Sequence, residues 1–391
     1  MGFPRVAILC PELGTNALGR ALLLARLLPA AARVEILGFT ALGGVWQPAR
    51  AVGIPIDGTP LRHVRELAAA RRWLRERVRA DVLLVSKALP TSLGLALASG
   101  LRDVRLALDV DDWEYGLSLP HDGSDPRPLR RAGAAVYGAL RRGQPNSVLG
   151  TRVCESLIRL VRPRLVSNRW LERRFGGTLL YHVRDPEELD PARVRGDALR
   201  RSLGLDARTW VGFVGTVRPH KGLQDLIEAL GSQRGPRAPG LLLLGTDPGD
   251  PVVAEVADLA QRVLGSARVR VLSQFPLARL AEHVQLADIV AIPSRDTLAS
   301  RGQLPAKLFD AMAMAKPVVA SALNDVPEVL EGCGVTVAPG DPRRIADAIA
   351  RLDDPRLRRE LGSAARQRVI ERYSFAAGRR ILTDFVEGAA A

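Results

Sequence analysis

Short apolar runs alternate with amphipathic helical patterns along the chain, and this alternation restricts the fold more than any other feature. Strands separated by helices pair in parallel and bury both faces of their sheet. The rhythm occurs in both halves, so we expect an α/β fold with two doubly wound, Rossmann-like domains. The expected strands are Val6–Cys10, Val34–Phe39, Val82–Ser86, Arg105–Val110, Arg164–Ser167, Leu179–Tyr181, Trp210–Val214, Leu241–Leu244, Val269–Leu272, Ile289–Ile292, Val318–Ala320 and Val335–Val337.

A polar stretch with two prolines, Arg184–Pro191, separates the two halves of the pattern. Domain boundaries fall in segments of this kind, and a length of 391 residues exceeds one average domain. We therefore expect an N-terminal domain over 1–187 and a second domain over 188–372. The chain ends in two basic helical patterns broken around Tyr373. The last of them, 373–391, is expected to pack back towards the N-terminal domain.

The loop that follows the apolar run Trp210–Val214 has the features of an anion site. The run ends at Gly215, and an amphipathic helical pattern begins near Leu223. Free amides at a helix N-terminus and the helix dipole both favour negative charge. The loop also contains Arg218 and Lys221, and two cations indicate a diphosphate rather than a carboxylate. The alternative is an ordinary βα turn with solvated cations.

Two strand ends in the first half carry polar residues, and ligands of doubly wound sheets bind beyond the carboxyl ends of the strands. After the first strand, Gly14 permits a tight turn close to a ligand's phosphates, and Asn16 is a candidate helix cap. A simple turn and cap is the alternative. The strand Arg105–Val110 leads into Asp109–Glu114, which contains four carboxylates. These would repel one another without a cation, a sugar hydroxyl or an arginine partner.

A helical pattern that begins near Leu304 follows the strand Ile289–Ile292 and a short loop. Pro305 suits the first turn of this helix. Lys307 and Asp310 are three residues apart and therefore share a helix face near its N-terminal end. A surface ion pair at this place would contribute little stability. The position directly after the loop favours a role in ligand binding.

Four ordered blocks in the second half resemble the donor-binding domain of GT-B glycosyltransferases, in particular the large family 4-like group of retaining enzymes, glycosyl transferases group 1. The resemblance covers roughly Trp210 to Ala377. It implies a GT-B architecture with an acceptor-binding first domain and a second domain that binds a nucleoside diphosphate sugar. The blocks are Val214–Gly222, Leu241–Gly245, Ala287–Ser294 and Leu304–Ala320.

The resemblance implies roles in donor binding for matching residues. Lys221 would contact the diphosphate. The family commonly has a second cation after the strand glycine, but this chain has Thr216 there, so Arg218 is the expected substitute. Asp310 takes the place of a glutamate that binds the ribose. The remaining donor-binding candidates are Gly14, Lys307 and the backbone of Gly302, Gln303 and Leu304, where Gly302 stands in place of the family's first signature glutamate.

Asp111 stands where the family often has a histidine that faces the donor sugar. If Asp111 is a general base, the reaction could be inverting. If it only binds a sugar hydroxyl, a retaining front-face displacement is expected. Asp109 and Asp111 also resemble the aspartate pair that holds a divalent metal in another, single-domain glycosyltransferase architecture. The two-domain pattern of the remaining chain fits that architecture less well.

These residues predict a retaining, metal-independent glycosyltransferase that moves a sugar from a nucleoside diphosphate sugar, its co-substrate, to an unidentified acceptor. Asp111, Arg218 and Lys221 are the catalytic candidates, and the two cations would stabilise charge on the leaving diphosphate. No cofactor or metal is expected. The absent glutamate and histidine motivate an alternative, a non-catalytic nucleotide-sugar-binding protein or partner subunit.

The net charge of +14 and the pI of about 10.8 predict anionic partners. Basic helical segments at Arg62–Arg79 and Arg127–Arg142 suggest an anionic membrane surface and a lipid-linked acceptor. A solvated basic face is the alternative, with a polysaccharide or a small molecule as acceptor. No nucleic acid is expected, because the arginines are not interleaved with aromatic residues.

The three cysteines are far apart and show no metal-ligand spacing, which is typical of reduced thiols in the cytoplasm. The apolar run Val6–Cys10 is too short for a signal peptide. No apolar run approaches the roughly 20 residues that span a bilayer. The expected location is therefore cytoplasmic, with peripheral attachment to the inner face of the membrane as an option.

Overall fold

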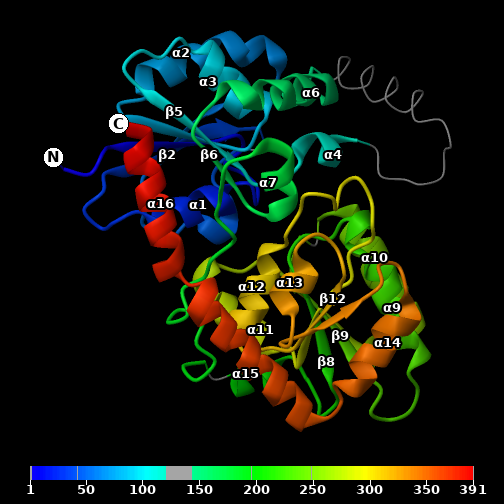
Figure 1. Cartoon of the computed structure of the whole chain (residues 1–391). Coiled ribbons are helices and arrows are strands. Elements are labelled where there is room, and N and C mark those ends of the chain that lie inside the picture. Colours follow the sequence, from blue (N-terminus) through cyan, green and yellow to red (C-terminus); the bar gives the residue numbers. More distant parts are fainter. Residues whose placement is uncertain (1, 42, 120–142, 195, 248, 391) are drawn as a thin grey trace. The chain divides into compact units, whose positions relative to one another are not determined.

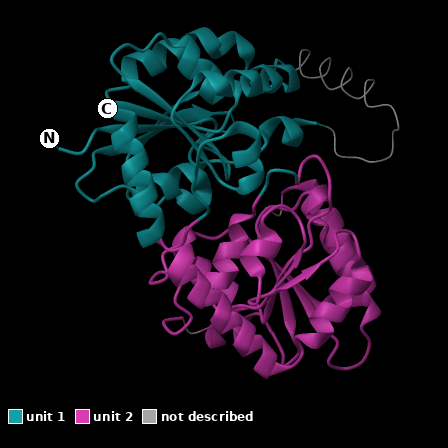
Figure 2. Cartoon of the chain, in the orientation of Figure 1, with its two compact units in different colours: residues 1–182, 301–303, 376–391 teal, residues 183–300, 304–375 magenta. Residues whose placement is uncertain are grey.

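The computed structural model describes the chain apart from residues 1, 42, 120–142, 195, 248 and 391. Its contacts define two compact units (Figure 2). Unit 1 comprises residues 1–182, 301–303 and 376–391, and unit 2 comprises residues 183–300 and 304–375. The division after His182 lies close to the polar stretch that begins at Arg184. Nearly all of the last helix, α16 (Phe375–Ala390), is part of unit 1.

Unit 1 contains a sheet of seven parallel strands in the order β3-β2-β1-β4-β5-β6-β7. The order reverses between β1 and β4, which are neighbours at the switch point of this sheet. The strands are β1 (Val6–Cys10), β2 (Val34–Thr40), β3 (Ile56–Pro60), β4 (Val82–Ser86), β5 (Arg105–Val110), β6 (Arg164–Val166) and β7 (Thr178–Leu179). The α-helices before α16 are α1 (Leu18–Leu27), α2 (Leu67–Arg77), α3 (Leu95–Ala98), α4 (Glu114–Ser118), α6 (Val148–Leu157) and α7 (Arg169–Phe175).

Unit 2 contains a second parallel sheet, of six strands in the order β10-β9-β8-β11-β12-β13. Here the order reverses between β8 and β11. The strands are β8 (Trp210–Val214), β9 (Gly240–Thr246), β10 (Val269–Ser273), β11 (Ile289–Ile292), β12 (Val318–Ser321) and β13 (Val335–Val337). The α-helices are α8 (Asp197–Ser202), α9 (Leu223–Ser232), α10 (Pro251–Leu264), α11 (Leu280–Gln285), α12 (Ala306–Ala313), α13 (Val326–Leu330), α14 (Pro342–Arg351) and α15 (Pro355–Arg372) (Figure 1).

Each unit has its own apolar core. Strands β1, β4 and β8 are buried along their whole length, as central strands of a sheet covered on both faces should be. In unit 2, Leu226 and Leu230 of α9 pack with Val211 and Leu243 of the sheet. The α/β fold class with two doubly wound sheets is confirmed.

The sequence pattern missed one strand and misplaced one helix cap. β3 has the sequence Ile56-Asp-Gly-Thr-Pro60, and proline and glycine are tolerated mainly in edge strands. It lies at the edge of its sheet and has no apolar run by which to recognise it. Asn16 does not cap α1 with its side chain. The backbone carbonyl of Asn16 accepts from the Gly19 N–H at 3.0 Å instead.

Candidate functional site

In unit 2, the carboxyl ends of β8 and β11 meet at the switch point, where open α/β sheets bind their ligands. The loop after β8 and the loop after β11 are fastened to one another. The Arg295 N–H donates to the His220 carbonyl at 2.9 Å. The Arg295 guanidinium donates two hydrogen bonds to the carboxylate of Asp225 in α9, at 2.6 and 2.8 Å. These bonds hold the two loops in a fixed position where a ligand would bind.

Gly222 ends the loop after β8, and its position leaves no room for a side chain. Its φ of 70° lies in the left-handed region, and a Cβ there would lie 1.9 Å from the carbonyl oxygen of Pro293. The close approach of the two loops therefore depends on this glycine.

We expect Gly222→Ala to lower the free energy of unfolding by about 2–6 kcal/mol, from backbone strain together with the backbone clash. Gly265→Ala is a matched control, because Gly265 has a φ of 82° but no atom within 4 Å of its Cβ position. Chemical unfolding measures both variants. Equal losses would show that the contact with Pro293 contributes nothing.

Lys307 of α12 brings a partly buried cation to the same loops. Its Nζ lies 3.7 Å from the centroid of the Phe213 ring, and a Cβ on Gly215 would lie 3.9 Å from it. Burial, and then the neighbouring charge of Lys221, lower the pKa of Lys307 well below its ordinary value. In the described part of the chain, no carboxylate forms an ion pair with Lys307. Two lysines close together in a partly buried place favour an anionic ligand.

The other predicted donor residues of unit 2 are placed as follows. Arg218 is 48% exposed, and its Nη1 donates to Asp250 at 2.7 Å rather than turning to the lysines. Asp310 does not pair with Lys307, because its carboxylate accepts from the Arg184 Nε. Leu304 is buried, and Thr216 follows Gly215 directly.

In unit 1, Asp109 lies near the end of β5 and Asp111 directly follows the strand. Both carboxylates face the guanidinium of Arg20. The guanidinium of Arg20 donates to both oxygens of Asp109, at 2.9 to 3.2 Å. It also donates to the carbonyls of Leu180 and Tyr181 at 2.9 and 3.3 Å. Arg20 and Asp109 are 3% and 0% exposed. The carboxylate of Asp109 is therefore a structural partner of Arg20.

Asp111 is surrounded by basic side chains. Lys87 Nζ lies 3.2 Å from its Oδ2, and His182 Nε2 lies 3.2 Å from its Oδ1. Arg20 Nε is 3.8 Å away. Burial alone would raise the pKa of Asp111, but Lys87, His182 and Arg20 outweigh it and hold the pKa well below the usual range. Asp111 is therefore an ionised and weakly basic carboxylate.

Three further predicted residues lie in unit 1. The Gly14 N–H donates to Glu12 Oε1 at 2.8 Å, so this amide is already used within the loop. Gly302 has a φ of 67°, and a Cβ there would lie within 3.0 Å of Trp170 and Trp113. Gln303 Nε2 donates to the carboxylate of Asp112 at 3.2 Å.

The sequence analysis missed Arg20, Lys87 and His182. Arg20 and Asp109 are 89 residues apart in the chain, and only the neighbouring positions of β1, β4 and β5 bring them together. Lys87 had a usable signal. It directly follows a predicted strand, and it is one of only four lysines in a chain whose other basic residues are arginines.

The carboxylates of the acidic segment face basic side chains in the part of the chain that the structure describes. No group of three or more His, Cys, Asp or Glu side chains there is arranged to hold a metal ion. The carboxylates face Arg20 and Lys87 instead. The resemblance of Asp109 and Asp111 to a metal-binding aspartate pair is therefore not supported by their surroundings.

Comparison with known proteins indicates the same class of protein as the sequence motifs, the glycosyltransferases. Residues 208–354 match the family model of glycosyl transferases group 1. The chain is 29% identical over 204 residues to an alpha-D-kanosaminyltransferase of Streptomyces kanamyceticus, covering 51% of this chain and 50% of that protein. It is 36% identical over 174 residues to a D-inositol 3-phosphate glycosyltransferase of Corynebacterium diphtheriae, covering 42% and 40%. The matches thus span about half or less of these relatives.

Solved structures are similar over nearly the whole chain. Sucrose-phosphate synthase from Thermosynechococcus elongatus has a TM-score of 0.69 at 19% identity and covers 96% of both chains. The Anabaena protein HepE in complex with UDP-glucose has a TM-score of 0.72 at 18% identity and covers 98% of this chain and 100% of its own. The fold is therefore GT-B. Together with the family model, this confirms the resemblance to glycosyl transferases group 1.

Proposed function

We propose that the chain is a glycosyltransferase that moves a sugar from a nucleoside diphosphate sugar to an acceptor. The observation that carries the proposal is Lys307 beside Gly215 and near the charge of Lys221, at the switch point of unit 2. Two cations next to a helix N-terminus suit a diphosphate. The match of residues 208–354 and the UDP-glucose held by the Anabaena neighbour support the same class of ligand.

In this proposal, Lys221 and Lys307 stabilise the negative charge that develops on the leaving diphosphate. The first turn of α12 adds its dipole. The Gly215 N–H is used by the Leu244 carbonyl at 2.7 Å, so Thr216 has the next backbone amide for a phosphate oxygen. Lys307 takes the role that the sequence analysis gave to Arg218. Because these cations neutralise the diphosphate, we propose a reaction that requires no metal.

Asp111 supports a retaining rather than an inverting reaction. An inverting enzyme needs a general base with a pKa near the working pH. The cations around Asp111 hold its pKa well below the usual range, so it would accept a proton poorly. An ionised carboxylate can instead stabilise positive charge on the sugar in a front-face displacement. We also propose that Asp310 binds the ribose of the donor, as predicted from the sequence.

A panel of UDP, GDP, ADP and TDP with their sugars tests the proposal. The matching nucleotide at about 100 times its Kd should raise the melting temperature by several degrees. The same donor, labelled in the sugar, should then give a glycosylated product or slow hydrolysis, with EDTA leaving the rate unchanged. Binding without either product would favour the alternative, a non-catalytic nucleotide-sugar-binding protein. No shift with any nucleotide would remove both.

We also propose that unit 1 attaches to an anionic membrane surface, where a lipid-linked acceptor would be found. No helix among the described residues is long and apolar enough to cross a membrane. The predicted basic segment Arg62–Arg79 includes α2, and its seven arginines are exposed. The second basic segment, 127–142, lies outside the described residues. A polysaccharide or a small molecule is the alternative acceptor.

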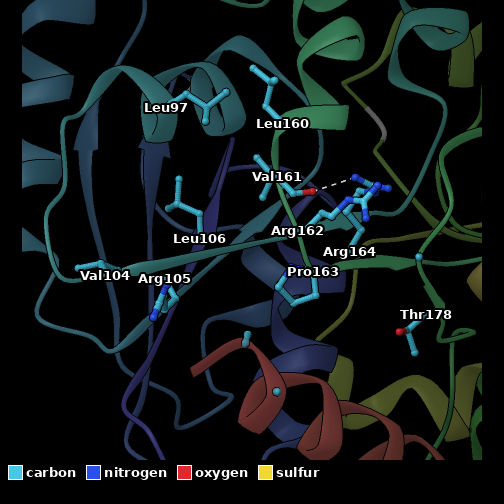
Figure 3. A pocket seen from close by; sticks show the side chains of 13 residues that line it. Leu97, Val104, Arg105, Leu106, Leu160, Val161, Arg162, Pro163, Arg164 and Thr178 are labelled. Carbon is cyan, nitrogen blue, oxygen red and sulfur yellow. Dashed lines mark hydrogen bonds between the residues drawn. The ribbon is translucent and has the colours of Figure 1, made fainter. Parts of the chain in front are cut away.

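A second surface of unit 1 also suits an anionic membrane. A cavity of about 800 Å³ is lined by Arg105, Arg162 and Arg164, by apolar side chains and by no acidic residue (Figure 3). Leu160 at its rim is 70% exposed. Leu149 and Val153 of α6 are also exposed and, four residues apart, share one face of that helix. Exposed apolar side chains beside arginines are typical of helices that lie on anionic lipid.

Co-sedimentation with vesicles tests this attachment. Binding to phosphatidylcholine vesicles should require added phosphatidylglycerol and should weaken with salt. Arg162→Glu should lower binding by about thirtyfold, because each charge near the surface is worth about 1 kcal/mol and the substitution changes the charge by two. Arg344→Glu on unit 2 is the control. Equal binding to neutral and anionic vesicles would contradict the proposal.

A further inference from the structure

Lys87 directly follows β4, at the switch point of unit 1, in a backbone conformation that lysine rarely adopts. Its φ is 68°, in the left-handed region. Its N–H donates to the Asp109 carbonyl at 2.8 Å, and its own carbonyl accepts from Ser92 Oγ at 2.6 Å. These bonds to neighbouring elements fix the conformation. Strained residues of this kind are concentrated at functional sites.

The side chain of Lys87 is fully committed to carboxylates. Its Nζ lies 2.6 Å from Asp112, 2.8 Å from Glu114 and 3.2 Å from Asp111. An ammonium group has three N–H donors, so each carboxylate can receive one. Lys87 is only 7% exposed. The left-handed backbone thus directs one buried ammonium into three acidic side chains.

The charges that face Asp111 come from several elements. Lys87 follows β4, Arg20 belongs to α1, and His182 lies after β7. The carboxylates of Asp109, Asp112 and Glu114 belong to the same segment as Asp111. Arg20 already holds Asp109 through its two oxygens. Loss of Lys87 would leave Asp112 and Glu114 without the cation that they share. Asp111 would then face Arg20, at 3.8 Å, and His182.

We infer that Lys87 is a positioning residue that holds the Asp111 side chain in place as an anion. This inference rests on the role in sugar transfer that we propose for Asp111. The pKa directions agree with the geometry. Burial would lower the pKa of Lys87, but Asp112, Glu114 and Asp111 outweigh it and raise the pKa well above its ordinary value. Without this cation, burial would favour the protonated form of the carboxyl groups.

Lys87→Met tests the inference, because it removes the charge and keeps a side chain of similar length. The acid limb of the kcat–pH profile should move upwards by at least about one pH unit, since a nearby opposite charge lowers a carboxyl pKa by about 1–3 units. Lys87→Arg should restore most of the wild-type profile. A profile that is unchanged in Lys87→Met would overturn the inference.

Melting temperature against pH gives a second readout that needs no activity. Buried carboxyl groups without Lys87 would have pKa values raised above those of the unfolded chain. Their contribution to stability is then present below the unfolded pKa of about 4 and is lost as the pH rises. The deficit of Lys87→Met relative to wild type should therefore grow between about pH 4 and 7. A deficit that is constant with pH would mean a role in shape alone and would overturn the inference.

Lys316→Met is the matched control, since Lys316 is a partly buried lysine of unit 2 whose Nζ donates to the Gln285 carbonyl at 3.1 Å. Burial lowers the pKa of Lys316 to about 8, so its loss should cause no deficit that grows between pH 4 and 7. If Lys87→Met does not fold, Lys87→Gln takes its place in both measurements. A wild-type chain that transfers no sugar would refute the proposed function, while the melting data would still decide whether Lys87 keeps these carboxylates ionised.

Discussion

We expect Lys307→Met to weaken the binding of a nucleoside diphosphate by about 10- to 100-fold, while unit 2 remains folded. A hydrogen bond to a charged group contributes about 1.5–3 kcal/mol. Methionine can fill the space against Phe213, and its neutral side chain has no charge to bury there. Lys221→Ala should cause a loss of similar size. Isothermal titration with the nucleotide selected from the panel measures both losses.

Binding at Lys307 should also take up a proton. Burial and Lys221 lower the pKa of Lys307 well below its ordinary value in the free protein, and a bound diphosphate would raise it again. Between these two pKa values the complex holds a proton that the free protein lacks. Affinity should therefore fall as the pH rises through this interval. Titrations in buffers with different ionisation enthalpies measure the uptake directly.

Lys316→Met is the control for this experiment too, because it removes a partly buried lysine of unit 2 that the proposal does not place in the site. Its nucleotide affinity should equal that of the wild type. Proton uptake that persists unchanged in Lys307→Met would show that another group titrates. Unchanged affinity in both Lys307→Met and Lys221→Ala would refute the diphosphate site.

The fold followed from the sequence because its signal is local. Runs such as Val6–Cys10 and Trp210–Val214 are apolar throughout, and such runs mark central strands of parallel sheets. The strand Ile56–Pro60 was not predicted, because an edge strand needs no apolar run. The glycines and Lys221 of the loop after β8 could also be found, since an anion site between a strand and a helix is a local motif.

The partners of charged side chains could not be found in this way. Arg218 is close to Lys221 in sequence, yet its long exposed side chain reaches Asp250, the residue that caps α10. Lys307 is far from Lys221 in sequence but lies near it, because β8 and β11 are neighbours in the sheet. The cation that lies near Lys221 is therefore determined by the order of the strands in the sheet. The sequence predicts this order only in outline.

We expect Asp111→Asn to lower kcat by about 100- to 1000-fold with little change in the KM for the donor. The substitution keeps the shape of the side chain and removes its charge, and a preorganised charge at a reaction centre contributes about 3–4 kcal/mol to the rate. Asp81→Asn is the control within unit 1, because Asp81 forms an exposed ion pair with Arg5. Its kcat should be that of the wild type.

The pH profile and the product together decide how Asp111 acts. The folded-state pKa of Asp111 is held well below its ordinary value, so the anion is lost only as the pH falls through that low pKa. The wild-type rate should therefore show no limb from Asp111 near neutral pH, and NMR should show that the anomeric configuration of the donor is retained. An inverted product with a limb near neutrality that disappears in Asp111→Asn would instead identify Asp111 as a general base. Lys87, His182 and Arg20 would then need to move away from the carboxylate when the donor binds, because in their present positions they make it a weak base.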